Sequence, residues 1–330
     1  MAWVLSSCAW AGGEVMSRGV AVETRDLSKR YDGVTVVDRL NLAIGENQAF
    51  GLLGPNGAGK TTTILMLLGL TEPTSGSAQI GGFDPAREPL KVKRLVGYMP
   101  EKLGFYDNLT ARENLDLIAQ FNGISAGDSR RRGDELLEKV GIARAADLAV
   151  GKFSKGMKQR LGIADVLIKN PKVAIFDEPT AGLDPEGISQ VLDIIAGLPA
   201  EGTTVMMSSH RLYEVQRVCH RVGILARGKL VVEGSLDELS QRAQGESRYR
   251  IEVATGEGAA GLADIIKSIS GVSNVSAKDN RLVINTDTDI RSEIAKTVVA
   301  NNIPLVEIKI QELTLDDIYM KYFREGETGK

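Results

Sequence analysis

The sequence is poor in cysteine. Its 330 residues contain two, Cys8 and Cys219. Their positions match no metal-binding spacing and offer no disulfide framework that could staple a fold together. The cysteine content therefore excludes a cysteine-built metal or disulfide scaffold, and it is typical of a protein from a reducing compartment.

Long hydrophobic runs are also missing. The apolar stretches end well short of the roughly 18 uninterrupted residues that a transmembrane helix needs, so we expect any role at a membrane to come through a partner. The formal net charge is −3, without the strongly basic domain or stripe that usually marks nucleic-acid binding. We therefore expect no nucleic-acid partner, and we interpret the short run Arg130–Arg132 as a solvated face.

Residues 1–19 lack the features of an export signal. The apolar start Met1–Leu5 is short, no basic segment precedes it, and Leu5–Cys8 only superficially resembles a lipoprotein cleavage box. Our interpretation is that these residues form a disordered N-terminal extension or reflect a start codon placed too early.

What the sequence does contain is a complete phosphate-binding loop, Gly54–Thr61, between a strand-like run and an apolar helical run. Glycines let the backbone approach phosphates closely, and the free amides and dipole of a helix N-terminus favour anions. Lys60 is expected to reach the β- and γ-phosphates of ATP, and the Thr61 hydroxyl is expected to hold Mg2+. The predicted nucleotide-binding residues here are Gly54, Pro55, Asn56, Gly57, Ala58, Gly59, Lys60, Thr61 and Thr62.

A second motif is the apolar run Val173–Phe176, which predicts a buried parallel strand and is followed by Asp177 and Glu178. The carboxyl end of such a strand lies at the sheet edge beside the phosphate loop. Asp177 is then placed to hold Mg2+, and Glu178 to deprotonate the attacking water as a catalytic general base. General-base help typically raises a rate by about 10²–10⁴.

A third motif, Phe153–Met157, precedes a helical run. The Ser154 hydroxyl and the Gly156 amide at a helix N-terminus form a further anion site. Serine at this position is also ordinary helix-capping chemistry, so the motif gains its meaning from lying just upstream of the acidic strand.

Together these motifs resemble the ATP-binding cassette (ABC) ATPases, in the family's order and over about Val20–Ser235. The resemblance implies that Tyr31 stacks on adenine, that Phe153–Met157 is the signature motif, that Ala181–Asp184 is the D-loop, and that His210 is a catalytic switch histidine that contacts the γ-phosphate. Of the two histidines, His220 matches no motif and is interpreted as structural.

The resemblance also implies a homodimer. Ser154 and Gly156 of one ATPase subunit would close over the ATP that is bound by the phosphate loop of the second subunit, head to tail. One copy of each motif per chain therefore predicts two nucleotide sites in a pair of chains.

Two departures from the family pattern narrow the resemblance. Glu101 stands where most members have glutamine; its oxygen can ligate Mg2+, but it cannot donate the amide hydrogen bond. In the signature motif, Lys155 and Met157 replace the usual glycine and glutamine. With the C-terminal segment Leu313–Tyr319, these features resemble the ABC-2 branch, in which the ATPase associates with a separate integral-membrane permease, commonly for export.

Phe105 and Tyr106 follow Glu101 closely, and we predict that they help to form the groove that receives a cytoplasmic helix of the permease. Within the branch, the run Tyr98–Tyr106, together with Phe153–Met157, is similar to the ATPase subunit that serves copper-site assembly in nitrous-oxide reductase. This similarity concerns ATP and coupling, whereas the membrane partner chooses the cargo.

The predicted fold class is α/β: an ABC-type P-loop NTPase core at residues 20–244 with a helical subdomain inserted at about 89–165. Residues 245–330 follow a β-α-β-β-α-β order that predicts a small α+β, ferredoxin-like accessory domain. Capped helices are expected after Ser235 and after Thr314. We favour a dimer-stabilising role for the accessory domain over regulation by a small ligand.

The sequence thus predicts an ATP-binding and ATP-hydrolysing subunit of an ABC transporter, which dimerises on ATP at the cytoplasmic face of the cell membrane and drives transport, in the direction of export. The alternative is a soluble ABC ATPase that acts on DNA or ribosomes. Such DNA-repair members carry long coiled-coil insertions and translation factors carry tandem cassettes, and neither feature is present here.

Overall fold

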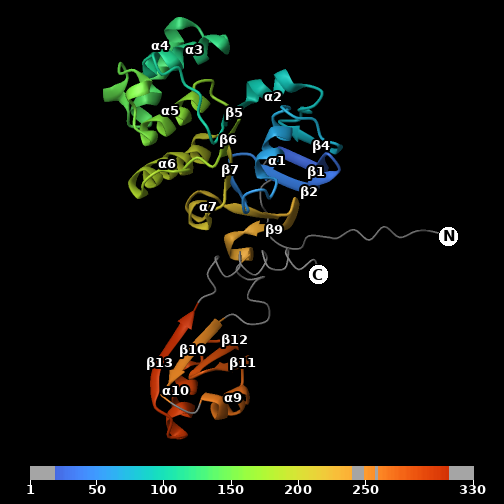
Figure 1. The fold of residues 1–330 in the computed structure, drawn as a ribbon, viewed down its shortest axis with the longest axis vertical. Helices are drawn as coiled ribbons and strands as arrows, with labels where there is room; N and C mark the ends of the chain where they lie inside the picture. The colour runs from blue at the N-terminus through green and yellow to red at the C-terminus, as the bar shows by residue number, and fades with distance from the viewer. Residues whose placement is uncertain (1–18, 240–248, 257–258, 312–330) are drawn as a thin grey trace, which may run out of the picture.

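The computed structural model describes residues 19–239, 249–256 and 259–311 (Figure 1). Residues 1–18 of the predicted N-terminal extension lie outside these ranges, and so does the predicted helix after Thr314. Among the described residues, no helix combines the length and the apolar character that crossing a membrane requires.

The central element is a mainly parallel sheet of six strands in the described chain, in the order β5-β6-β7-β3-β8-β9. β9 pairs antiparallel with β8, and the other neighbours are parallel. Every residue of β3, β6 and β7 is buried, which explains their continuous apolar runs. The strands are β3 (Ala49–Leu53), β5 (Val96–Met99), β6 (Val173–Asp177), β7 (Thr204–Ser209), β8 (Arg221–Ala226) and β9 (Lys229–Ser235).

Both faces of this sheet are covered, and the alternation of side chains along β3 shows how. Phe50 and Leu52 pack with Ile64 of α1 in one hydrophobic cluster, whereas Ala49 and Leu53 belong to a second cluster on the other face. The covering helices on this part of the chain are α1 (Lys60–Leu67), α6 (Pro185–Gly197) and α7 (Leu212–Val218), with a 3-10 turn at Leu198–Glu201.

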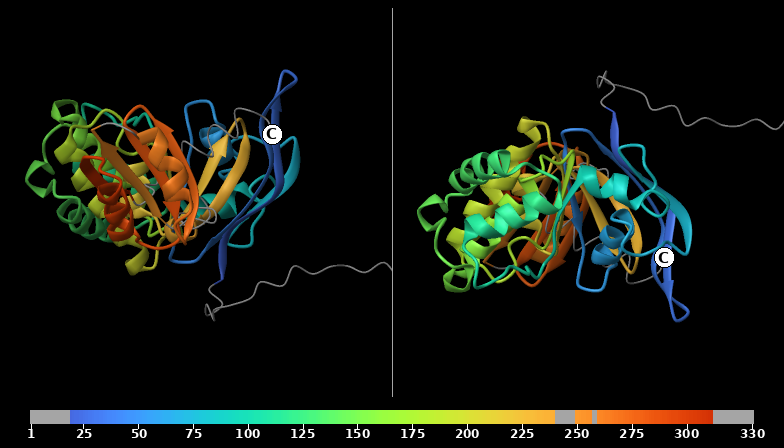
Figure 2. Two further views of the ribbon diagram at one scale, coloured as in Figure 1. Left: turned by 90° about the horizontal axis from the view of Figure 1, so that it is seen from below. Right: turned by 90° about the horizontal axis from the view of Figure 1, so that it is seen from above.

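A smaller antiparallel sheet has the order β2-β1-β4, formed by β1 (Val20–Tyr31), β2 (Val34–Gly45) and β4 (Ser75–Ile80). The sequence pattern pointed clearly to β1 but not to its partners. In β2 the alternation of buried Leu40, Leu42 and Ile44 follows the charged residues Asp38 and Arg39, and β4 is short, polar and begins with a serine and a glycine. The two views in Figure 2 place this sheet and the helices α3–α5 at opposite ends of the cassette.

The stretch predicted to be helical, at about 89–165, contains four helices but also β5, which is an edge strand of the central sheet. Three of the helices begin at side-chain caps: Thr110 and Glu113 form a reciprocal capping box, and Ser125 and Ser154 accept backbone hydrogen bonds. They are α2 (Pro89–Leu95), α3 (Ala111–Phe121), α4 (Ala126–Lys139) and α5 (Lys155–Leu167), with 3-10 turns at Ala143–Ala145 and Val150–Lys152.

The C-terminal elements form an antiparallel sheet of their own, in the order β11-β12-β10-β13, with the predicted β-α-β-β-α-β succession. Their core is a separate hydrophobic cluster that includes Ile251, Leu262, Ile284 and Ile294. The predicted fold class, an α/β core with a ferredoxin-like C-terminal unit, is confirmed. The elements are β10 (Tyr249–Thr255), α9 (Ala259–Lys267), β11 (Val272–Lys278), β12 (Arg281–Thr286), α10 (Arg291–Ala300) and β13 (Leu305–Gln311).

Candidate functional site

The predicted phosphate loop connects β3 to α1, as its sequence context indicated. Gly59 is the N-cap residue of α1 with a left-handed backbone (φ 102°), and Thr63 donates to its carbonyl from both the amide and the side chain, at 2.9 Å each. A Cβ built on Gly59 would lie 2.7 Å from the Val36 carbonyl oxygen. Only glycine fits here, because both the backbone angle and the close approach exclude a side chain.

Backbone hydrogen bonds hold the loop against the strands on either side of β3. The Gly54 amide donates to the Ser209 carbonyl of β7 at 3.2 Å, and the Gly228 amide of the β8–β9 turn donates to the Ala58 carbonyl at 3.0 Å. The loop is therefore shaped by the sheet before any ligand binds, which lowers the entropic cost of binding.

Lys60 occupies the centre of the loop and is 6% exposed. Its ammonium group donates to the carbonyls of Gly54 at 2.7 Å and Pro55 at 3.2 Å. It also lies 3.2 Å from Oε1 of Glu178. The loop thus holds a buried cation directly opposite the predicted general base.

Asp177 ends β6 and faces the start of α1. Its Oδ2 accepts from the Thr61 hydroxyl at 2.9 Å, and its Oδ1 accepts from the Ser208 hydroxyl of β7. The hydroxyl and carboxylate oxygens that meet here are the hard donors that Mg2+ prefers, so these two residues fit the cation. In β5, burial and the Asp177 charge raise the pKa of Tyr98 to about 12.

Glu178 follows Asp177 in a left-handed backbone conformation, with φ at 49°. Its amide donates to both the carbonyl and the hydroxyl of Ser208, at 3.2 and 3.1 Å. The side chain lies between two cationic or polar groups: Oε1 is beside Lys60, and Oε2 is 2.8 Å from Nδ1 of His210, whose side chain is 41% exposed. The structure therefore joins Lys60, Glu178 and His210 into one chain of contacts.

Ser154 and Gly156 lie apart from this chain of contacts. Ser154 caps α5 by accepting from the Met157 amide at 3.2 Å, and nothing closes off the space at Gly156. Both line an open cavity of about 350 Å³ that they share with D-loop residues Gly182–Asp184. No residue of the phosphate loop lines this cavity, so within one chain the two anion sites remain separate.

Two further predicted residues lie outside the chain of contacts. Tyr31 is the last residue of β1 and is 43% exposed; its ring centre lies 4.9 Å from the Lys29 ammonium, and its hydroxyl lies 3.4 Å from the Thr71 hydroxyl. Glu101 is exposed in the loop after β5. Within the described residues, the acidic side chains form no group of three or more that could hold a metal, so Glu101 does not join Asp177 and Glu178 in such a group.

Sequence reasoning missed Ser208 and Glu214. Ser208 lies opposite Asp177 in the parallel pairing of β6 and β7, and its hydroxyl contacts both acidic residues. Glu214, on α7, is fully buried and bonded to Thr180 and Ser209. The available signal for Glu214 was its position in the sequence, four residues after His210 in a helical stretch.

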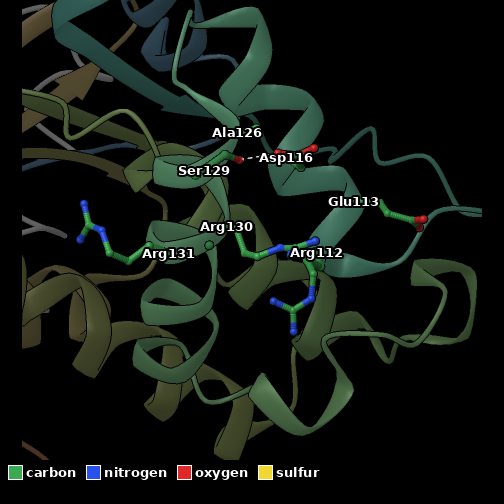
Figure 3. A pocket seen from close by; sticks show the side chains of 9 residues that line it. Arg112, Glu113, Asp116, Ala126, Ser129, Arg130 and Arg131 are labelled. Atoms are coloured by element: carbon green, nitrogen blue, oxygen red, sulfur yellow. Dashed lines mark hydrogen bonds between the residues drawn. The ribbon is translucent and has the colours of Figure 1, made fainter.

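A hollow of about 680 Å³ between α3 and α4 is shown in Figure 3, and several of its charged side chains are paired. Arg112 bonds with Asp134 and Asp147, and Asp116 accepts from the Ser129 hydroxyl at 2.6 Å. Arg131 points away from the hollow in this view. Arg130 and Arg131 are exposed, as predicted for a solvated face, whereas Arg132 is half-buried and its guanidinium donates to the Ile168 carbonyl at 3.5 Å.

The loop after β5 forms a second, smaller hollow of about 210 Å³ with α3 and α5. Phe105, Tyr106 and Ile118 contribute to its lining, and Asn114 fixes the loop by accepting from the Tyr106 amide at 3.0 Å. Asp165 of α5 also lines it, and its Oδ1 is buried without a hydrogen-bond partner. This is the region where the groove for the permease was predicted.

The model for the ABC transporter family matches residues 37–181, and the model for the C-terminal domain of DrrA1-3-like ATP-binding proteins matches residues 234–323. The chain is 37% identical over 309 residues to the bacitracin transport ATP-binding protein BcrA of Bacillus licheniformis, covering 93% of this chain and 99% of BcrA. It is 32% identical to the linearmycin resistance ATP-binding protein LnrL of Bacillus subtilis, covering 91% of this chain and 97% of LnrL.

Among solved structures, the dimeric ATP-binding cassette MJ0796, in a post-hydrolysis state with ADP and phosphate, matches with a TM-score of 0.60 at 26% identity, covering 65% of this chain and 98% of that one. The phosphate loop, the adjacent acidic strand and the sheet order define a P-loop nucleoside triphosphatase. The chain belongs to the ABC transporter family, as an ATP-binding and ATP-hydrolysing subunit with a DrrA-like C-terminal domain.

The first prediction concerns Gly59. In Gly59→Ala the new Cβ would meet the Val36 carbonyl oxygen and require a strained left-handed alanine. We expect ATP to bind about tenfold more weakly or worse, as measured by titration with a fluorescent ATP analogue. Gly127→Ala is the matched control, because Gly127 of α4 has open space around it. Equal affinity in the Gly59 variant and the control would contradict this reading of the loop.

The second prediction concerns Asp165. Burial raises the pKa of its carboxyl from 3.8 to about 6, with Lys169 opposing the shift. Because the folded state holds the proton more tightly, stability should fall as the pH rises from about 4 to about 6.

In the Asp165→Asn variant, which has no carboxyl to titrate at this position, this loss of stability with rising pH should not occur. The free energy of unfolding of the variant, relative to that of the natural chain, should rise across this pH window by up to about 2–3 kcal/mol and then level off. Urea titrations at several pH values measure the difference, and a difference that does not change with pH would refute it.

Proposed function

We propose that this chain hydrolyses ATP with Glu178 as the general base and Lys60 as the cation that holds the β- and γ-phosphates. The observation that carries the proposal is the position of the Glu178 carboxylate between the Lys60 ammonium, at 3.2 Å, and His210 Nδ1, at 2.8 Å. This position supports the proposal, because a base beside Lys60 would lie near the γ-phosphate of a triphosphate held by the phosphate loop.

The chemistry follows from these positions. Glu178 accepts a proton from a water molecule, the water oxygen forms a bond to the γ-phosphorus, and the bond between that phosphorus and the bridging oxygen of ADP breaks. His210 keeps the second carboxylate oxygen of Glu178 engaged. The products are ADP, inorganic phosphate and a proton.

Thr61 and Asp177 are the residues that would hold Mg2+. When bound, the cation neutralises phosphate charge that develops as the bond breaks. Ser208 keeps one oxygen of Asp177 in place, and the other faces Thr61. Assigning Glu101 to the same cation stays a prediction, because that residue lies exposed outside the group.

The site is proposed to be completed by a second copy of the chain. Ser154 and Gly156 line an open cavity that contains no residue of their own chain's phosphate loop, and a related cassette has been solved as a dimer. In a head-to-tail pair these two residues would face the γ-phosphate that the other copy binds. Tyr31, with an exposed ring, would stack on the adenine base.

The membrane permease is proposed to dock in the hollow beside Phe105 and Tyr106. The hollow combines apolar side chains with an exposed tyrosine, which suits the apolar face of a helix. This assembly would hold the chain at the cytoplasmic face of the membrane. The C-terminal unit, at 245–330 in the predicted division, is proposed to stabilise the dimer.

The cargo is proposed to be a compound that is exported, because relatives that align over nearly the whole chain are named for bacitracin transport and linearmycin resistance. These relatives share the C-terminal unit, which favours a transporter over a soluble ATPase that acts on DNA or ribosomes. The similarity to the nitrous-oxide reductase system remains a prediction about coupling motifs.

The third prediction concerns the general base. Glu178→Gln cannot accept the proton, so phosphate release should fall by about 10²–10⁴-fold while ATP binding is retained. ATP turnover and nucleotide titration are measured on the full chain. Glu135→Gln, an exposed glutamate of α4 that pairs with Arg131, is the matched control. Turnover within about threefold of the natural chain would rule out Glu178 as the base.

The fourth prediction concerns the docking hollow. The double variant Phe105→Ala, Tyr106→Ala should no longer co-purify in detergent with the permease, because an apolar anchor is removed from the contact. Phe121→Ala removes an aromatic side chain of α3 that is 74% exposed and does not line the hollow, so it serves as the control. Retention of the permease by the double variant would place the contact elsewhere.

A further inference from the structure

Glu214 is a charged residue that the proposed chemistry does not use. It lies on α7, four residues after His210, and is 0% exposed. A buried carboxylate is costly unless hydrogen bonds or an ion pair compensate the loss of water. The partners of Glu214 therefore show what the fold uses this charge for.

Both carboxylate oxygens of Glu214 are bonded. Oε2 accepts from the Ser209 hydroxyl at 2.7 Å, and Oε1 accepts from the Thr180 hydroxyl at 2.6 Å. Oε1 also accepts from Tyr213 Oη at 3.2 Å and from Arg211 Nη1 at 3.3 Å. The two hydroxyls that make the short bonds are themselves buried.

These two short bonds reach the segments that carry the proposed catalytic groups. Thr180 is two residues after Glu178, in the turn that follows β6, and Ser209 is the last residue of β7 and directly precedes His210. The two strands are neighbours in the central sheet, and α7 follows β7 (Figure 1). One carboxylate on α7 therefore spans the ends of both strands.

Glu178 needs such support, because its backbone is left-handed and a residue with a side chain adopts this conformation only where its surroundings fix it. Its amide is held by Ser208, and its carbonyl accepts from the Ala181 amide at 3.1 Å. Thr180 lies inside this turn. The hydrogen bond between the Thr180 side chain and Glu214 therefore constrains the turn that orients the proposed general base.

We propose that Glu214 is a positioning residue for ATP hydrolysis, which ties the turn after Glu178 to the segment of His210 so that these two side chains stay in hydrogen-bond contact. The inference rests on the role proposed above for Glu178. It assigns Glu214 no contact with nucleotide, so its loss affects turnover rather than binding.

The test uses the full chain and compares kcat for ATP with the dissociation constant of a fluorescent ATP analogue. Glu214→Gln and Thr180→Val should each lower kcat by about 10–100-fold, because a displacement of about 1 Å at a catalytic group costs on that order. The dissociation constant should stay within about threefold. Thr180→Ser keeps the hydroxyl and should retain most of kcat, as a conservative rescue.

The Thr180 pair remains informative if Glu214→Gln folds poorly. Valine has the shape of threonine, and Glu214 keeps its bonds to Ser209, Tyr213 and Arg211 in that variant. Equal kcat values for Thr180→Val and Thr180→Ser would overturn the proposal.

A second measurement separates positioning from a general structural effect. If Glu214 acts through the contact of Glu178 with His210, then Glu214→Gln should reduce the residual turnover of His210→Ala by less than about threefold, because coupled residues are not additive. If the double variant instead loses turnover by the product of the two single-variant factors, the proposal is overturned.

Failure of the inference can be told apart from failure of the proposed function by assaying Glu178→Gln in parallel. If Glu178→Gln is inactive and Glu214→Gln keeps the kcat of the natural chain, only the role of Glu214 is refuted. If Glu178→Gln hydrolyses ATP at the normal rate, the assignment of Glu178 as the general base is refuted, and the positioning role of Glu214 is refuted with it.

Discussion

The parallel pairing of β3, β6 and β7 is the constraint on which the rest of the site depends. In this register Leu53 lies opposite Ser209, and Asp177 lies opposite Ser208. The phosphate loop, the acidic pair and the histidine segment therefore leave the sheet at one edge, although Thr61 lies 116 positions before Asp177 and Glu178 lies 32 positions before His210. A slip of one residue would turn each of these side chains to the other face.

Much of this arrangement was predictable from the sequence, because the determining signals are local. Continuous apolar runs indicate strands that are buried on both faces, and Gly54–Thr61 combines a turn, a lysine and a helix start in one segment. The ferredoxin-like unit was likewise predictable from its alternating strands and its helices with amphipathic spacing. Each of these patterns lies within one short segment of the sequence and can be interpreted without knowledge of distant residues.

The parts that could not be predicted depend on contacts between distant segments. Ser208 and Glu214 matter because of what lies across the sheet or under a helix, and neither residue type is unusual for its element. The strands β2 and β4 carry polar residues that local patterns assign to loops, and pairing with β1 overrides that tendency. The cargo is equally beyond local signals, since the motifs recognised in this sequence concern ATP rather than a transported compound.

The ion pair between Lys60 and Glu178 has a consequence for the chain before it meets nucleotide. The ammonium that is proposed to bind phosphate is paired with the carboxylate that is proposed to activate water. In the roles proposed for these residues, a triphosphate would compete with Glu178 for this cation. Phosphate binding and release of the carboxylate would then be one event, so that nucleotide itself would free the base.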